Sequence, residues 1–200
     1  MKIIHYINQF FAGIGGEEQA DQAPFIKAEL IGPAVALNAM VKPNGGEVTH
    51  TIVCGDNFMG SHTDEAVETI LGFLADKEFD LFVAGPAFQA GRYGFACGTI
   101  CKAVQARYHV PVLTSMHMEN PGVEMFHKDM PIFIGGKSAA KMRSDVTLIA
   151  NYINKDLTGK PHTGAVDEKF FPRGVRHQAW PAGEKIAARR GVEMLIKKLK

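Results

Sequence analysis

The stretch LFVAGPAFQAGRYGFACGTICKAV, from Leu81 to Val104, joins an apolar segment to a glycine-rich turn and then to a helical pattern. Leu81 to Ala84 is a continuous apolar run, which is typical of a strand that is buried on both faces of a sheet. After Gly91, one helical stripe collects the residues Cys97, Ile100, Cys101, Val104 and Tyr108. A buried strand followed by an amphipathic helix predicts one unit of a parallel α/β sheet.

Similar strand-like segments recur along the chain, with helical patterns between or after most of them. The expected strands are Ile3 to Ile7, Val48 to Cys54, Leu81 to Ala84, Val112 to Ser115 and Ile132 to Ile134. One helix is expected from Ser61, which forms an approximate capping box with Asp64, and another is expected to be capped by Ser138. The alternation predicts a doubly wound, flavodoxin-like, mostly parallel sheet with helices on both faces and right-handed crossovers.

The length and a hydrophobic content of 46% predict a single α/β domain over residues 1–200. Its core is expected over residues 1–157, and residues 158–200 are expected to form an aromatic arm and a closing helix. The apolar stripe of that helix is Ala188, Val192, Leu195 and Leu199. The arm is expected to pack on the body or on a partner. Residues 10–43 are expected to form a long ordered loop over the strand ends, with a short helix at 34–41.

Charge and composition exclude several classes of protein. The formal net charge is +1 and basic residues are spread along the chain, so the sequence shows no basic patch of the kind that binds nucleic acid. The sequence shows no signal peptide and no apolar run long enough to span a membrane. Three cysteines, without a secretion signal, predict reduced thiols and a cytoplasmic location.

Two glycine-rich segments invite a nucleotide-binding interpretation. Gly13 and Gly15 match the first two positions of a dinucleotide fingerprint, but Glu18 occupies the third glycine's place. The segment IGGKSAAKM, residues 134–142, resembles a phosphate loop, yet Pro131 stands where its first glycine belongs. Both patterns favour ordinary turns. A flavodoxin-like flavin or nucleotide carrier nevertheless stays open as an alternative function.

The most informative loop follows the strand at Leu81 to Ala84. Ligands of open parallel sheets bind beyond the carboxyl ends of the strands. Glycines allow close backbone approach to a ligand, and the guanidinium of Arg92 matches a carboxylate. The alternative is a compact turn with Arg92 facing water. Residues at the ends of neighbouring strands complete the predicted substrate-binding set: Asn8, Asp56, Asn57, Gly85, Gly91, Arg92, Tyr93, Gly94, Glu119 and Asn120.

Several of these residues also have a structural interpretation, because Asp and Asn are common in ordinary turns. No metal site is predicted, since the sequence has neither an HExxH nor a CxxC pattern. Cys97 and Cys101 are four residues apart on a helix, too far to form a disulfide without unwinding it. Both are expected to be buried. Cys97 is the candidate catalytic thiol, because a helix N-terminus lowers a thiol pKa.

Several blocks of sequence resemble one family over nearly the whole chain and in the right order. The blocks are HYINQFFAGIGGEE (5–18), CGDN (54–57), AGPAFQAGRYGFACGTICKAVQ (84–105), ENPGVEMF (119–126), GKSAAKMR (136–143) and FFPRGVRHQAW (170–180). They are similar to the selenoprotein B subunit of the glycine, sarcosine and betaine reductases of anaerobic bacteria, a group that includes the D-proline reductase subunit.

The resemblance implies a role in reductive cleavage of the C–N bond of a small amino acid or its N-methyl derivative. It implies a partner subunit that carries a pyruvoyl group, and a selenoprotein A component whose selenol receives the carboxymethyl unit. The family's selenocysteine lies beyond the matched region, and none of Cys54, Cys97 and Cys101 matches it. The chain is therefore expected to be the amino-terminal portion of such a subunit, with no cofactor of its own. A noncatalytic binding or assembly subunit and a homo-oligomer stay open.

Overall fold

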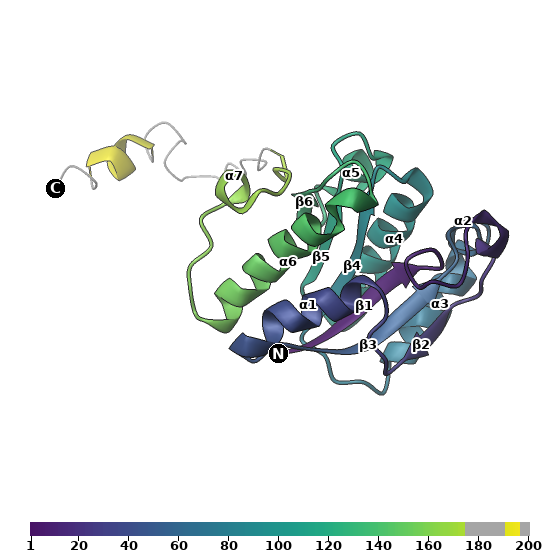
Figure 1. Cartoon of the computed structure of the whole chain (residues 1–200). Helices are drawn as coiled ribbons and strands as arrows, with labels where there is room; N and C mark the ends of the chain where they lie inside the picture. The colour runs from purple at the N-terminus through teal and green to yellow at the C-terminus, as the bar shows by residue number, and fades with distance from the viewer. Residues whose placement is uncertain (175–190, 197–200) are drawn as a thin grey trace.

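The computed structural model describes residues 1–174 and 191–196 (Figure 1). The strands are β1 (Lys2–Asn8), β2 (Phe25–Lys27), β3 (Glu47–Cys54), β4 (Leu81–Phe88), β5 (Val112–Met116) and β6 (Ile132–Ile134). The helices are α1 (Pro33–Val41), α2 (Asp56–Ser61), α3 (Thr63–Leu74), α4 (Gly91–Tyr108), α5 (Pro121–Phe126), α6 (Met142–Leu157) and α7 (Ala165–Glu168). Short 3-10 turns are η1 (Glu17–Gln19), η2 (Lys42–Asn44) and η3 (Ala139–Lys141).

The strands form one sheet in the order β2-β3-β1-β4-β5-β6. The five strands from β3 to β6 in this order are parallel, and each was expected from its apolar run. Their order is the flavodoxin-like one, so the predicted fold class is confirmed. The chain leaves β1 toward β3 on one side and later enters β4 on the other. This change of direction places a topological switch point between β1 and β4.

Two layers of helices cover the sheet, because successive strand residues point to opposite faces. On one face, α1 and α6 lie side by side and enclose Ile3, Val83 and Ile149 (Figure 1). On the other face, α3 and α4 enclose Tyr6, Ile70 and further buried side chains. Both faces are therefore apolar, which leaves the strand ends as the place for polar chemistry.

The expected helix caps are wrong. Ser61 ends the additional short helix α2, and its Oγ donates to the Asn57 carbonyl at 2.6 Å. The following helix α3 begins at Thr63, with His62 as N-cap and no side-chain capping bond. Ser138 precedes η3 and likewise makes no capping bond. An extra helix directly after β3 was not visible in the apolar pattern, because its six residues bury few side chains.

The segment 10–43 has more structure than the expected loop. It contains η1, the edge strand β2 and α1, and β2 pairs antiparallel with β3 through Phe25 opposite Val53. The backbone N–H of Gly55 donates to the Gln22 carbonyl at 2.8 Å, which holds the chain before β2 against the start of α2. The short helix expected at 34–41 is confirmed as α1.

The described part of the arm packs on the body at the β6 edge. The N–H of Phe171 donates to the Ile132 carbonyl at 2.9 Å, and the N–H of Ile134 donates to the Lys169 carbonyl at 2.8 Å. Residues 191–196 are helical and exposed. Of the predicted closing-helix stripe, Val192 and Leu195 fall in this helix, whereas Ala188 and Leu199 lie outside the described residues.

A candidate substrate cavity at the switch point

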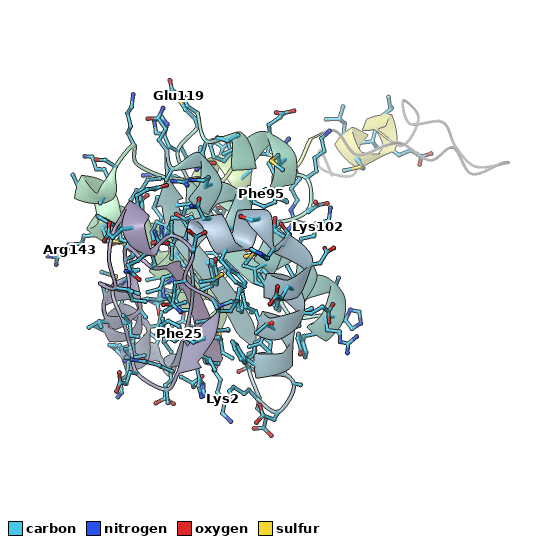
Figure 2. The ribbon with its side chains drawn as sticks, turned by 90° about the vertical axis from the view of Figure 1, so that its right-hand side faces the viewer. Lys2, Phe25, Phe95, Lys102, Glu119 and Arg143 are labelled. Carbon is cyan, nitrogen blue, oxygen red and sulfur yellow. The ribbon has the colours of Figure 1, made fainter. Side chains whose placement is uncertain are left out.

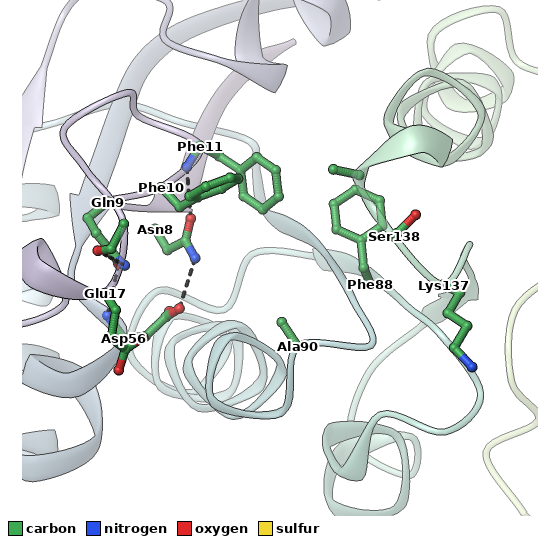
Figure 3. A pocket seen from close by; sticks show the side chains of 12 residues that line it. Asn8, Gln9, Phe10, Phe11, Glu17, Asp56, Phe88, Ala90, Lys137 and Ser138 are labelled. Atoms are coloured by element: carbon green, nitrogen blue, oxygen red, sulfur yellow. Dashed lines mark hydrogen bonds between the residues drawn. The ribbon is translucent and has the colours of Figure 1, made fainter.

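A cavity of about 390 Å³ lies at the switch point, where β1, β3 and β4 end (Figure 3). Its walls come from the turns after β1 and β4, the start of α2 and the loop that follows β6. The lining residues are Asn8, Gln9, Phe10, Phe11, Gly16, Glu17, Asp56, Phe88, Ala90, Lys137, Ser138 and Ala139. In open parallel α/β sheets, ligands bind at this position.

Asn8 and Asp56 form the polar part of the cavity wall. The N–H of Phe11 donates to Asn8 Oδ1 at 3.0 Å, which fixes the amide so that Nδ2 faces Asp56. Asn8 Nδ2 donates to Asp56 Oδ2 at 2.9 Å, as Figure 3 shows. Gln9 Oε1 in turn accepts the backbone N–H of Asp56 at 3.1 Å. The end of β1 thus holds both the backbone and the side chain of Asp56.

Asp56 carries the unusual electrostatics of the cavity. Its side chain is only 9% exposed, and burial raises its pKa to about 6 although Asn8 and Arg92 oppose the shift. Oδ1 of this carboxylate is enclosed by protein and has no hydrogen-bond partner among the described residues. A buried anion with an unfilled oxygen is costly, and a cation bound beside it removes that cost. The cavity therefore favours a ligand with a positively charged group.

Three aromatic rings form the apolar part of the wall. The ring centroids of Phe10 and Phe11 are 5.2 Å apart, and those of Phe11 and Phe88 are 5.5 Å apart. The three rings are therefore continuous, and we call them the aromatic wall (Figure 3). Phe10 is 59% exposed, whereas Phe88 is buried at the end of β4.

Over its whole length, the chain is similar in sequence to one family of known proteins. A family model described as glycine/sarcosine/betaine reductase selenoprotein B (GRDB) matches residues 1–200. The chain belongs to this family. No solved structure matches it.

The selenoprotein B relatives are components of reductase complexes. The betaine reductase complex component B subunit beta of Peptoclostridium acidaminophilum is 57% identical over 99% of this chain. The glycine reductase complex component B subunit gamma of Peptoclostridium litorale is 43% identical over 100% of the chain. The sarcosine reductase complex component B subunit beta of Peptoclostridium acidaminophilum is 41% identical, also over 100%. The chain spans 45% of the length of each of these relatives.

In this selenoprotein B family chain, Arg92 and Asn57 lie beside the cavity rather than in its lining. Arg92 Nη2 donates to Glu17 Oε2 at 2.5 Å, and Nη1 donates to Asn57 Oδ1. The guanidinium thus binds a carboxylate, as its chemistry predicts, but the carboxylate belongs to the same chain. The pair is exposed, and it ties η1 to the start of α4.

The residues predicted after β5 have two different environments. Glu119 is exposed, accepts a hydrogen bond from Gln89 Nε2 at 2.6 Å and lies 3.8 Å from Lys137 Nζ. Asn120 is buried and caps α5, with Oδ1 accepting the Gly122 N–H at 2.9 Å. Its Nδ2 donates to the carbonyls of Phe88 and Ala90. Asn120 therefore holds the β4–α4 turn that lines the cavity.

The predicted glycines are close to protein atoms rather than to the cavity. Gly85 has a φ of +90°, and its carbonyl accepts a hydrogen bond from His5 Nε2 at 2.6 Å. Burial lowers the pKa of His5 to about 4, so the ring is neutral near pH 7 and Nε2 is its donor. A Cβ at Gly91 would lie 3.3 Å from Pro121. These glycines allow α4 and its preceding turn to pack tightly.

Tyr93 and Cys97 lie behind the aromatic wall, in the core. The Tyr93 ring is 5.7 Å from the Phe11 ring, and its buried hydroxyl has no partner among the described residues. Burial raises the pKa of the Cys97 thiol well above its usual value, so the expected lowering at the helix start is wrong. Desolvation outweighs the helix N-terminus because the thiol is completely buried. Cys54 and Cys101 are also free and buried, with raised pKa values.

The glycine-lysine-serine turn after β6, residues 136–138, binds a carboxylate from the same chain. The N–H of Gly136 donates to Asp145 Oδ1 at 3.1 Å and Oδ2 at 3.0 Å. A carboxylate from α6 thus occupies the place where a phosphate loop would hold phosphate, which supports the ordinary-turn interpretation. Among the described residues, no group of three or more potential metal ligands is close enough to hold an ion. No helix in the described ranges could cross a membrane.

Sequence reasoning missed most of the cavity wall. The missed residues are Gln9, Phe10, Phe11, Gly16, Glu17, Phe88, Ala90, Lys137, Ser138 and Ala139. One signal could have identified part of this set, because Gln9, Phe10 and Phe11 directly follow the predicted first strand. Residues at that position face the ligand in flavodoxin-like sheets.

Proposed function

We propose that the chain is the substrate-binding part of a glycine, sarcosine or betaine reductase complex, and that the switch-point cavity takes the small zwitterionic substrate. The observation that carries this proposal is the buried carboxylate of Asp56 on the cavity wall, one oxygen of which has no partner among the described residues. The names of the relatives supply the substrate class, since they refer to glycine, sarcosine and betaine reductase complexes. All three carry a cationic nitrogen and a carboxylate, one carbon apart.

The two ends of such a substrate match two parts of the lining. Asp56 faces the cationic nitrogen, and Asn8 keeps the carboxylate of Asp56 oriented. Lys137 and Ser138 come from the loop after β6 and are available to the substrate carboxylate. The chain therefore binds and orients the substrate, so that its C–N bond has a defined position for the other components.

The reducing groups are assigned to other parts of the complex. The three thiols of the chain do not fit a redox centre, because burial raises the pKa of each and keeps it protonated. Under the proposal, a partner subunit supplies the pyruvoyl group, and selenocysteine lies outside this chain. The complex also includes the selenoprotein A component and works in the cytoplasm.

Titration of the purified chain with glycine, sarcosine and betaine, followed by NMR chemical shifts, tests the proposal. Shifts confined to the cavity residues support it. A chain that binds none of the three compounds, while its spectrum is that of a folded protein, contradicts it.

Replacing Lys137 tests the carboxylate end of the site. We expect Lys137→Ala to weaken binding about fivefold, since an exposed cation contributes about 1 kcal/mol to such an ion pair. The matched control is Lys102→Ala on α4, whose partner is Asp129. Equal affinity of the Lys137 and Lys102 variants would place the carboxylate elsewhere.

An assembly role without chemistry is the second candidate, and the burial of all three thiols favours it. We expect Cys97→Ala to leave the turnover of the reconstituted complex unchanged, because a buried, protonated thiol is no nucleophile. The measurement is the rate with saturating substrate. A loss of turnover without a loss of thermal stability would restore Cys97 as a catalytic residue.

A further inference from the structure

We propose that the switch-point cavity selects a quaternary ammonium group over a primary one, by seating it against the aromatic wall beside Asp56. This inference rests on the proposed function and names the substrate within its class. The ligand is an N-permethylated amino acid, of which N,N,N-trimethylglycine is the smallest. Two observations carry it: the aromatic wall beside the buried Asp56 carboxylate, and the small number of unpaired acceptors among the buried polar groups of the lining.

The aromatic wall provides the surface that a quaternary ammonium group requires. Its charge is spread over methyl groups that donate no strong hydrogen bonds, so it binds to the faces of aromatic rings near an anion. Phe10, Phe11 and Phe88 offer such faces, and Asp56 offers the anion in the same cavity (Figure 3). A polar, hydrated primary ammonium group gains much less from apolar rings.

The hydrogen-bonding capacity of the lining also favours a quaternary over a primary ammonium group. A primary ammonium group has three donors that each need an acceptor when water is removed. The side-chain amides cannot supply them, because Asn8 Oδ1 already accepts the Phe11 N–H and Gln9 Oε1 accepts the Asp56 N–H. Asp56 Oδ1 is unpaired but is itself enclosed by protein, so its charge rather than a hydrogen bond acts on the ligand. The other side-chain oxygens of the lining, on Glu17 and Ser138, belong to exposed residues, and Glu17 Oε2 already accepts from Arg92.

Most backbone carbonyls of the lining already accept a hydrogen bond as well. Carbonyls that already accept a hydrogen bond are those of Asn8, Gln9, Phe10, Gly16, Glu17, Phe88, Ala90, Lys137 and Ser138. The lining therefore combines the charge of the buried Asp56 with an apolar aromatic surface and few unpaired buried acceptors. That combination suits a trimethylammonium group and leaves at least part of a primary ammonium group without partners.

Isothermal titration of the chain with a graded series of ligands tests the inference. The series is glycine, its mono-, di- and trimethylated forms, and 3,3-dimethylbutyrate, an uncharged isostere of the trimethylated head. We expect affinity to rise with each methyl group, with trimethylglycine binding at least about tenfold more tightly than glycine. The isostere is expected to bind more weakly than trimethylglycine, because it lacks the charge that Asp56 attracts.

Variants of the aromatic wall isolate the contribution of the rings. Leucine keeps an apolar side chain but removes the aromatic face, so Phe11→Leu is expected to lower the affinity for trimethylglycine about tenfold. Phe10→Leu is a second wall variant that is expected to fold even if Phe11→Leu does not, since Phe10 is 59% exposed. The matched control is Phe79→Leu, which changes a partly buried ring in a different hollow, beside Lys2 and Tyr108.

The outcomes separate this inference from the proposed function. Failure of every ligand to bind contradicts the substrate site itself. Binding of all amino acids without a preference for methylation, or tighter binding of glycine, overturns the quaternary selectivity and leaves the site in place. Equal binding of the isostere and trimethylglycine overturns the role of charge. A wall variant that weakens binding no more than Phe79→Leu overturns the role of the rings.

Discussion

Asp56→Asn is expected to lower the affinity for a zwitterionic substrate about a hundredfold while making the chain more stable at pH 7. The affinity falls because the substitution removes the buried charge that faces the cationic nitrogen, and such charge-assisted contacts contribute about 3 kcal/mol. The stability of the fold rises because the substitution replaces a buried charged carboxylate, one of whose oxygens has no partner, with a neutral amide. Asn8 Nδ2 retains an acceptor, since the new side chain presents an oxygen of its own.

The stability gain follows from the direction of the pKa shift. The pKa of Asp56 rises from 3.8 to about 6 in the folded state, so folding favours the protonated carboxyl. Its favourable contribution is complete below pH 3.8 and is lost as the pH rises through about 6. At pH 7 the ionised group therefore destabilises the wild-type fold by about 3 kcal/mol relative to the protonated group. Urea unfolding of both chains at pH 7 and pH 4 measures this difference.

Asp145→Asn is the matched control, because Asp145 is another buried carboxylate, outside the cavity. Both of its oxygens accept hydrogen bonds, from the Gly136 N–H and from Ser115 or Ser144. The amide cannot replace all of them, so this variant is expected to lose stability at pH 7, where Asp56→Asn is expected to gain it. Wild-type affinity is expected to fall as the pH drops through 6, and Asp56→Asn is expected to show no such dependence. A stable Asp56→Asn protein with wild-type affinity would contradict the assignment.

Gly94→Ala is expected to destabilise the chain by about 3 kcal/mol, although it adds only one methyl group. A Cβ on Gly94 would lie 2.1 Å from Asn120 Oδ1, so the Asn120 side chain would have to move. Its bonds to the Gly122 N–H and to the carbonyls of Phe88 and Ala90 would be lost, which leaves buried polar groups unpaired. Thermal unfolding measures the loss. Ligand affinity is expected to fall as well, because Phe88 and Ala90 line the cavity.

Gly72→Ala is the control for this effect. Gly72 lies in α3, and no other atom would be within 4 Å of its added Cβ. Alanine restricts the unfolded chain, so the control is expected to gain up to about 1 kcal/mol. If Gly94→Ala were as stable as the Gly72 variant, Asn120 would not hold the β4–α4 turn as described.

The sequence predicted the framework of the sheet because local patterns determine it. The run Leu81 to Ala84 and its four counterparts are apolar because each strand is covered on both faces, and all five are strands of the parallel sheet. The edge strand Phe25–Lys27 escaped prediction because none of its residues is fully buried, so it lacks the apolar run that marks the equally short Ile132–Ile134. It pairs with the distant residues Thr51 to Val53 of β3, which local periodicity cannot reveal.

The predicted strand ends included the position of the cavity but only part of its lining. Asn8 and Asp56 were predicted from their places after buried strands, and both line the cavity. The sequence could not show which partner each polar side chain takes, since Arg92 pairs with Glu17, 75 residues away. Phenylalanines such as Phe10 and Phe88 are common in cores, so their contribution to a cavity wall appears only when the turns are placed in three dimensions.

The two lateral borders of the sheet constrain how other proteins can attach to it. One border is the three-residue β2, and the other, β6, already has its backbone groups bonded to Lys169 and Phe171. Figure 2 shows Glu119 at one end of the molecule and Lys2 at the other. With both borders short or covered in the described chain, a neighbouring subunit cannot readily extend the sheet by adding a strand. A subunit that associates with the described part of the chain would therefore use side-chain contacts, and the exposed side chains of Phe10 and Met118 offer apolar surface for them.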